Sequence, residues 1–148
     1  ASPLVTTDTV TAKGKLRSIA FTHDQDGVGD AGSFVVIGKL PPGRVKILGG
    51  LSQFYCNFTA GSQTIDIGWQ AYEDLDGTAV ALDVDGMVDG LDVDAVGYFT
   101  MQGNTAATKL LGGNHTFTSK AGVVITVKAI GALADGDDLA GVITYIVD

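Results

Sequence analysis

The stretch LSQFYCNFTAGSQTIDIGW, residues 51–69, contains two runs in which apolar and polar side chains alternate. Strict alternation over five or more residues predicts a β-strand that buries one face. Residues 60–62, Ala-Gly-Ser, separate the two runs and predict a turn. The stretch therefore predicts two strands of a β fold. Their buried side chains are expected to be Phe54, Cys56, Phe58, Ile65, Ile67 and Trp69.

The rest of the chain repeats this pattern as short β-type runs between glycine- and proline-containing turns. Pro41 and Pro42 predict a corner between two runs, because proline is excluded from the interior of a sheet. The last run has apolar residues on both faces, so it is expected to lie centrally between two layers. A helical period sustained over three turns is found nowhere in the sequence. The further expected strands cover residues 15–22, 33–40, 44–50, 97–101, 115–120, 123–131 and 139–148.

Length and glycine content fit one β-rich domain. A chain of 148 residues is long enough to bury a sizeable core. Its 21 glycines, about twice the usual share, fit many tight turns. The sequence therefore predicts an all-β, single-domain antiparallel β-sandwich, jelly-roll-like, over residues 15–148. Residues 1–14 are polar, threonine-rich and contain Pro3, and they are expected to form an extended N-terminal arm or a first edge strand.

The charge is acidic and unevenly distributed along the chain. Seventeen Asp and Glu residues stand against nine Lys and Arg, which gives a net charge of -8. This balance argues against nucleic acid and against a membrane as partners, since both present negative charge. Six of the nine basic residues lie between Lys13 and Lys46, and none lies in residues 47–108. One end or face is therefore expected to be basic and another acidic, which favours head-to-tail contacts.

Residues 82–94, LDVDGMVDGLDVD, form a near-palindrome whose two LDVD pieces could pair as a hairpin. Such a hairpin would place Asp83, Asp85, Asp92 and Asp94 on one face, and like charges directly opposite each other destabilise a sheet. Residues 73–97 are therefore expected to form an irregular, turn-rich excursion in which aspartates cap turns. Its negative charge would keep a sheet-rich protein soluble and its edges unpaired.

No pattern in the sequence specifies a catalytic or cofactor site. The G-x-S-x-G elbow, the HEXXH motif, the P-loop and paired Cys-x-x-Cys motifs are all absent. His23 is expected in a loop and His115 at a strand edge. Cys56, which alternates with Phe54 and Phe58, is expected to be a small buried hydrophobe. The sequence therefore predicts a non-enzymatic protein with no catalytic, cofactor-binding or metal-binding residues.

Bound calcium is the alternative for the acidic segments. Calcium takes six to eight oxygen ligands from a flexible loop. The acidic pairs have x-Asp-x-Asp spacing but do not continue as an EF-hand, and the nearest loop has Val35 at its twelfth position. Solvated acidic loops are therefore favoured over a metal site. The residues concerned are Asp24, Asp26, Asp30, Asp74, Asp76, Asp83, Asp85, Asp92 and Asp94.

Several stretches together resemble small β-sandwich virion proteins of tailed bacteriophages, often capsid decoration (cement) proteins encoded among head genes. The stretches are LPPGRVKILGG, TIDIGWQAYEDLDG, LDVDGMVDGLDVDAVGYF and AGVVITVKAIGALADGDDLAGVITYIVD. They supply an entry strand at Pro42 to Ile47, a strand at Ile65 to Gly68, an acidic excursion at residues 73–97 and a closing strand at Gly141 to Val147. The resemblance covers most of residues 33–148.

The resemblance implies a structural protein on the exterior of a virion capsid, where it clamps neighbouring subunits of the major capsid protein. It also implies a homo-oligomer, with a trimer favoured. Residues 1–14 lie outside the resemblance, and their threonine-rich, proline-containing character suggests an intersubunit or capsid-binding arm. Two alternatives stay open: a phage fibre or tail structural protein, and a secreted calcium-supported carbohydrate-binding β-sandwich module. The second would display an exposed aromatic row, for which the candidates are Trp69, Tyr55, Tyr72, Tyr98 and Tyr145.

Overall fold

The computed structural model describes residues 15–59 and 63–147. This part of the chain is almost entirely β, and its strand pairs are antiparallel, which confirms the all-β prediction. The arm expected at residues 1–14 and the turn expected at residues 60–62 lie outside the described residues. The strands are β1 (Lys15–Asp24), β2 (Phe34–Leu40), β3 (Gly43–Ile47), β4 (Gln53–Asn57), β5 (Thr64–Trp69), β6 (Tyr72–Glu73), β7 (Ala79–Val80), β8 (Asp83–Asp92), β9 (Gly97–Thr100), β10 (His115–Ser119), β11 (Val123–Ala129) and β12 (Asp138–Val147). The helical elements are η1 (Gly49–Leu51) and α1 (Ala106–Leu110).

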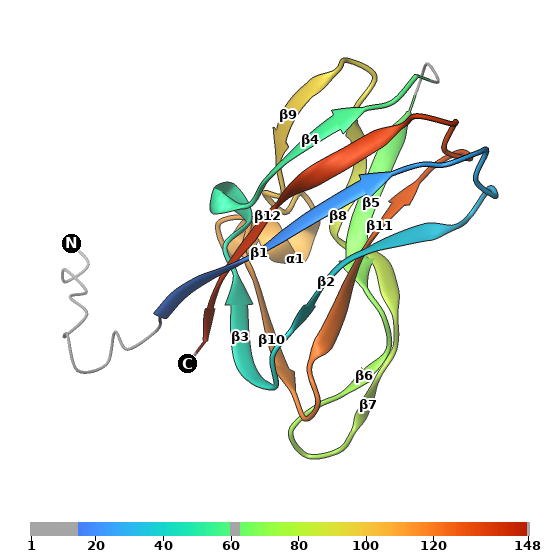
Figure 1. The fold of residues 1–148 in the computed structure, drawn as a ribbon. Helices are drawn as coiled ribbons and strands as arrows, with labels where there is room; N and C mark the ends of the chain where they lie inside the picture. Colours follow the sequence, from blue (N-terminus) through green and yellow to red (C-terminus); the bar gives the residue numbers. More distant parts are fainter. Residues whose placement is uncertain (1–14, 60–62, 148) are drawn as a thin grey trace, which may run out of the picture.

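The strands form two main sheets. In the six-stranded sheet A, β12 pairs with β1 along one edge and with β3 and β4 along the other, while β10 adds to β3 and β9 to β4. The four-stranded sheet B has the order β2-β11-β5-β8. In Figure 1, β1, β12 and β4 run side by side, and the β6–β7 hairpin projects at the lower end.

The pairing follows one nested scheme from the ends of the chain to its middle. β1 pairs with β12, β2 with β11, β3 with β10, β4 with β9, β5 with β8 and β6 with β7. A long antiparallel ribbon folded in this way gives two four-stranded layers, here β1-β12-β4-β9 and β2-β11-β5-β8. This is the strand arrangement of a jelly roll, with β3 and β10 as an added pair. The predicted jelly-roll-like sandwich is therefore confirmed.

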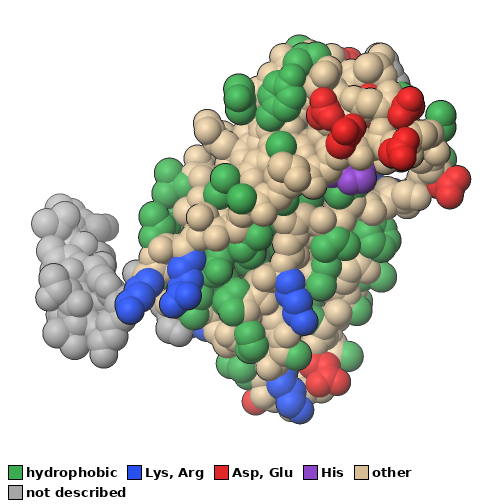
Figure 2. Space-filling model, viewed as in Figure 1, with side chains coloured by type: hydrophobic (Ala, Val, Ile, Leu, Met, Phe, Trp, Pro, Cys, Tyr) green, Lys and Arg blue, Asp and Glu red, His purple; other side chains and the backbone are tan. Residues whose placement is uncertain are grey.

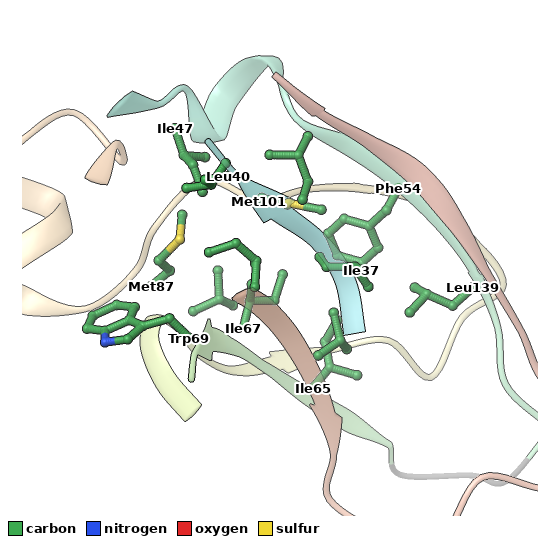
Figure 3. Close-up of a cluster of buried hydrophobic side chains, with 14 of the residues drawn as sticks. Ile37, Leu40, Ile47, Phe54, Ile65, Ile67, Trp69, Met87, Met101 and Leu139 are labelled. Carbon is green, nitrogen blue, oxygen red and sulfur yellow. The ribbon is translucent and has the colours of Figure 1, made fainter. Parts of the chain in front are cut away.

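The core fills the space between the two sheets, and the alternation seen in the sequence sets its composition. Ile65 and Ile67 of β5 and Cys56 of β4 are fully buried, and Phe54 of β4 is 1% exposed. Figure 3 shows Ile65, Ile67 and Phe54 gathered with Met87 of β8, Met101 and other apolar side chains of the core. All six core residues predicted from residues 51–69 are buried.

Strand β12 changes partner along its second edge, and Ser52 fills the gap. β12 pairs with β4 through Asp138–Gly141 and with β3 through Tyr145–Val147, so Thr144 lies between the two ladders. The Ser52 hydroxyl accepts a hydrogen bond from the Thr144 backbone N–H at 2.8 Å and donates to the Leu48 carbonyl at 2.8 Å. Ser52 is fully buried. A side chain thus replaces the missing ladder bond in the middle of sheet A.

The acidic segment is the main departure from the sequence-based expectation. Residues 73–97 are not an irregular excursion, and the LDVD pieces do not pair with each other. Instead β8 is a continuous strand that pairs with β5. Two irregularities in this ladder turn both Met87 and Val88 inward, while Asp85 and Asp89 stay exposed. The alternation that would have put all the carboxylates on one face is therefore broken.

Three smaller differences from the sequence-based expectation concern α1, β1 and β12. α1 was not predicted, because five residues are too few to show a helical period. Thr105 caps this helix by accepting a hydrogen bond from the Thr108 N–H at 3.3 Å. β1 extends through His23 and Asp24, which were expected in a loop. β12 is central within sheet A, as predicted, but its second face is not covered by another layer, since Val142 is 36% exposed. The corner at residues 41–42 is confirmed, because it joins β2 of sheet B to β3 of sheet A.

Replacing Ser52 by Ala should destabilise the protein by about 1–3 kcal/mol, because the buried Thr144 N–H loses its acceptor. Chemical denaturation of both proteins measures the difference. Ser18→Ala, on an exposed position of β1, is the matched control and should change the free energy of unfolding by less than about 0.5 kcal/mol. Equal stability of the two variants would contradict the role given to Ser52.

Candidate functional site

One side of the six-stranded sheet A faces away from the core. Leu139, Ile143 and Tyr145 of β12 are buried in the core, so the even-numbered positions of this strand point outward. The pairing register carries this alternation to β1, β4 and β9. We define the outer face of sheet A by the side chains of Leu16, Ser18, Ala20, Thr22, Gln53, Tyr55, Tyr98, Thr100, Ala140, Val142, Thr144 and Ile146.

Two tyrosines provide the aromatic part of this face. Tyr55 and Tyr98 lie opposite each other on β4 and β9 with ring centroids 5.4 Å apart, and Tyr98 is 77% exposed. The other candidates for an aromatic row are elsewhere: Trp69 and Tyr145 are buried, and Tyr72 packs against the core. Of the five candidates for the aromatic row that the carbohydrate-binding alternative requires, the described residues thus place only Tyr55 and Tyr98 on this face.

Charged side chains border the outer face at its two ends. At one end Asp24 of β1 lies directly opposite Asp138 of β12. At the other end Lys46 of β3 lies opposite Ile146, whereas Lys15 and Arg17 alternate with the outer-face positions of β1 and so lie on the other side of the sheet. Figure 2 shows basic side chains near the start of β1 and a group of acidic side chains at the upper right. The acidic end of the face is formed by Asp24 and Asp138, which lie outside residues 47–108, so the acidic segment singled out in the sequence does not form this end.

The acidic end is built from two loops that hold each other. The loop after β1 and the loop before β12 exchange backbone hydrogen bonds, from the Gln25 N–H to the Asp137 carbonyl at 2.9 Å and from the Gly29 N–H to the Leu133 carbonyl at 2.8 Å. Beside them lies a cavity of about 290 Å³ that includes His23 and Phe34 in its lining. This is slightly below the usual size of small-molecule sites, about 300–1,000 Å³. The geometry therefore favours a contact surface over an enclosed binding site.

Asp137 anchors this pair of loops to β4. Its side chain is fully buried and accepts three hydrogen bonds. One oxygen accepts from the Thr59 N–H at 2.8 Å and from the Thr59 hydroxyl at 3.0 Å, and the other from the Ala134 N–H at 2.8 Å. The loop between β11 and β12 is thereby tied to the end of β4. Asp137 is a structural residue that sequence reasoning did not single out from its neighbours Asp135 and Asp138.

Replacing Asp137 by Ala should destabilise the protein by about 3 kcal/mol or more, because three donors lose their acceptor at a buried position. Thermal and denaturant unfolding measure the loss. Asp135→Ala is the control, since Asp135 is exposed and accepts one hydrogen bond, from the Gly27 N–H at 2.9 Å. A similar cost for both substitutions would show that Asp137 does not have this anchoring role.

The remaining aspartates mostly cap turns or lie in solvent. Asp74 accepts hydrogen bonds from the N–H groups of Asp76 and Thr78, and Asp92 accepts from the Asp94 N–H at 3.0 Å. These contacts confirm the turn-capping interpretation for both residues. Within the described ranges, no group of three or more His, Cys, Asp or Glu side chains is placed to hold a metal ion.

Asp83 and Asp85 form an acidic pair at the start of β8, where Asp83 is opposite Trp69 in the β5–β8 register. Burial raises the pKa of Asp83, and its side-chain hydrogen bond to Asp85 raises it further. Trp69 is buried. The cavity beside His23 and a second cavity of about 440 Å³ beside Tyr72 include neither Asp83 nor Asp85 in their lining.

The Cys56 thiol is buried in the core, and His115 is half-buried against aromatic rings. Cys56 is buried, as predicted, and burial raises the pKa of its thiol to about 12. His115 begins β10 and stacks on Trp69 with centroids 4.7 Å apart. Phe117 lies against both rings, and burial lowers the pKa of His115. A neutral thiol and a stacked imidazole belong to the core and do not form a catalytic pair.

The lowered pKa of His115 predicts that stability falls as the pH drops. Below the ordinary histidine pKa of 6.5 the unfolded chain takes up a proton that the folded chain resists, so unfolding becomes more favourable. The slope from this one group is at most about 1.4 kcal/mol per pH unit. We expect His115→Gln to lose this part of the slope when unfolding free energies are compared between pH 7 and pH 5.5. Identical slopes for both proteins would contradict the prediction.

Comparison with known proteins identifies relatives by fold. A chain of the "Cyanophage Pam1 capsid asymmetric unit" superposes with a TM-score of 0.56 at 11% identity, over 99% of this chain and 94% of that chain. A chain of infectious bursal disease virus, Gx strain, superposes with a TM-score of 0.53 at 10% identity. That match spans 99% of this chain but only 36% of the viral chain.

At these identities the similarity establishes a shared fold. No protein-family model matches the sequence, and no curated protein sequence matches it. Among the helices of the described residues, none is long and apolar enough to cross a membrane.

Proposed function

We propose that this protein is a structural component of a virus particle, and that it acts as a decoration protein on the outside of a phage capsid. The observation that carries the proposal is the end-to-end fold match with the cyanophage capsid chain. Because the match takes in 99% of one chain and 94% of the other, the two chains are nearly equal in length. The similarity is thus to an independent small jelly roll, in contrast to the bursal disease virus chain, where the match spans 36% of its length.

The surface of the molecule supports a binding role over a chemical one. The six-stranded sheet A presents a regular outer face, and the Cys56 thiol is buried in the core. Cementing a shell uses many weak contacts spread over a surface, and repetition on the lattice makes them sufficient. The net charge of -8 supports a partner other than nucleic acid, and the major capsid protein is the partner proposed.

The proposal gives residues 1–14 the role of a capsid-binding or intersubunit arm attached to the sandwich of residues 15–148. The described chain begins with β1, whose first residues are exposed and which pairs only with β12 within the described residues. A strand with one unpaired edge accepts an added strand from a neighbouring molecule. The open edge of β1 is thus suited to accept such an arm from a neighbouring copy, in a homo-oligomer for which a trimer is the form favoured by the resemblance.

Fractionation of native particles on a density gradient tests the proposed function. The chain should band with particles and with a major capsid protein, in many copies per particle by quantitative mass spectrometry. A few copies per particle would point to a tail or fibre position and contradict the decoration role. Absence from every particle fraction would contradict the virion role as a whole, and retention on glycan columns with calcium-dependent stabilisation would favour the carbohydrate-binding alternative.

Deletion of residues 1–14 should weaken binding to particles at least tenfold while the sandwich stays folded, because the deleted residues precede the first strand of the jelly roll. Co-sedimentation with particles depleted of the protein measures binding, and thermal unfolding checks the fold. Substituting Thr6, Thr7 and Thr9 by Ser in the full-length chain preserves arm length and is the control. Unchanged particle binding after the deletion would exclude the arm as a binding element.

A further inference from the structure

The outer face of sheet A has the properties of a surface that another molecule covers. Between its charged ends it carries no charged side chain, and it exposes Tyr98 by 77%, Leu16 by 63% and Val142 by 36%. Leu51 of η1, beside β12, is 61% exposed. Uncharged surface with aromatic and aliphatic side chains is typical of the centre of a protein interface.

The two ends of the face differ in charge, and one of them is unfavourable in the isolated molecule. Asp24 and Asp138 occupy directly opposite positions on β1 and β12, a like-charge arrangement that destabilises a strand pair. Lys46, at the other end of the same face, points outward beside Ile146. A cation brought to the acidic end by another molecule would relieve the repulsion.

We propose that the outer face of sheet A binds the same face of a second copy of this chain. The charges at the two ends of the face determine the direction of the twofold axis that relates the two copies. A twofold axis that lies in the interface and crosses the strands turns the strand direction over, so the basic end of each copy meets the acidic end of the other. A twofold axis along the strands would place like charges together. The selected arrangement brings Lys46 of each copy toward Asp138 of the other.

The centre of the face fits a close, symmetric contact. Ala20 and Val142 are opposite each other in the β1–β12 register and lie near the midpoints of both strands, so the axis passes close to them. Their small size permits the sheets to approach at about the 10 Å spacing of stacked sheets. From strand rise and spacing, the six strands give the face a plan area on the order of 600 Å². Because protruding side chains make the face uneven, its accessible area exceeds this plan area and is near the roughly 800 Å² per partner of a standard interface.

This pairing goes beyond the proposed capsid role, and it assigns the outer face of sheet A to contact between two copies. The capsid would then be contacted through the remaining surfaces, which include the edge of β8 in each copy. The closed twofold pair also differs from the trimer that the resemblance implies, so the two assemblies are distinguished by mass.

Sedimentation equilibrium of the purified protein at tens of micromolar tests the proposal. The expected mass is twice the 15.2 kDa of the single chain. Val142→Asp and Ala20→Asp place like charges on both sides of the axis and should each raise the dissociation constant at least tenfold. Leu110→Asp, on the 89% exposed Leu110 of α1 outside the face, should leave the mass unchanged.

A charge exchange then tests the geometry. Lys46→Asp and Asp138→Lys should each weaken the pair, and the double variant should restore it, because the two positions meet across the axis. Circular dichroism and thermal unfolding confirm that each variant is folded. A monomer or a trimer for the unmodified chain would overturn the proposal. So would a dimer whose mass is insensitive to both Val142→Asp and Ala20→Asp, or a double variant no stronger than the single ones.

Discussion

The pairing of the first described strand with the last is the interaction on which the rest of the structure depends. β1 and β12 are joined along ten residues, from Lys15 opposite Val147 to Asp24 opposite Asp138. Every other pair is nested inside this one, so closing it aligns the ribbon that folds into two sheets. The contact joins opposite ends of the sequence and carries a large loop-closure cost. The hydrogen bonds that β12 makes with β1, β3 and β4 offset this cost.

The fold was predictable where alternation was strong and side chains were apolar. The runs around Phe54 and Ile65 gave the correct buried faces, and the corner at residues 41–42 was marked by its prolines. β8 was missed because four like charges argued against a regular strand, whereas irregularities in its ladder and its edge position let the aspartates reach solvent. The five-residue helix α1 carries no periodic signal, and the anchoring role of Asp137 depends on contacts with Thr59, 78 residues away in sequence.

The outer face of sheet A was less predictable than the fold, although part of its pattern is present in the sequence. Small and uncharged residues alternate along β1 and β12, at positions such as Ser18, Ala20, Ala140 and Val142. Only the register between the two strands shows that these positions form one continuous face. The same registers place Lys46 and the pair Asp24 and Asp138 at opposite ends of that face, and Figure 2 shows the acidic side chains gathered at the upper right. One architecture thus provides the core, the outer face of sheet A and the charge polarity.

A cryo-electron microscopy reconstruction of particles that contain this chain tests the central claim, a decoration role on the capsid, most directly. The account predicts a jelly roll of this strand order on the outer surface of the shell, at repeated lattice positions and in contact with more than one major capsid subunit. Density for the chain only in the tail or fibres, or on the inner surface of the shell, would contradict it.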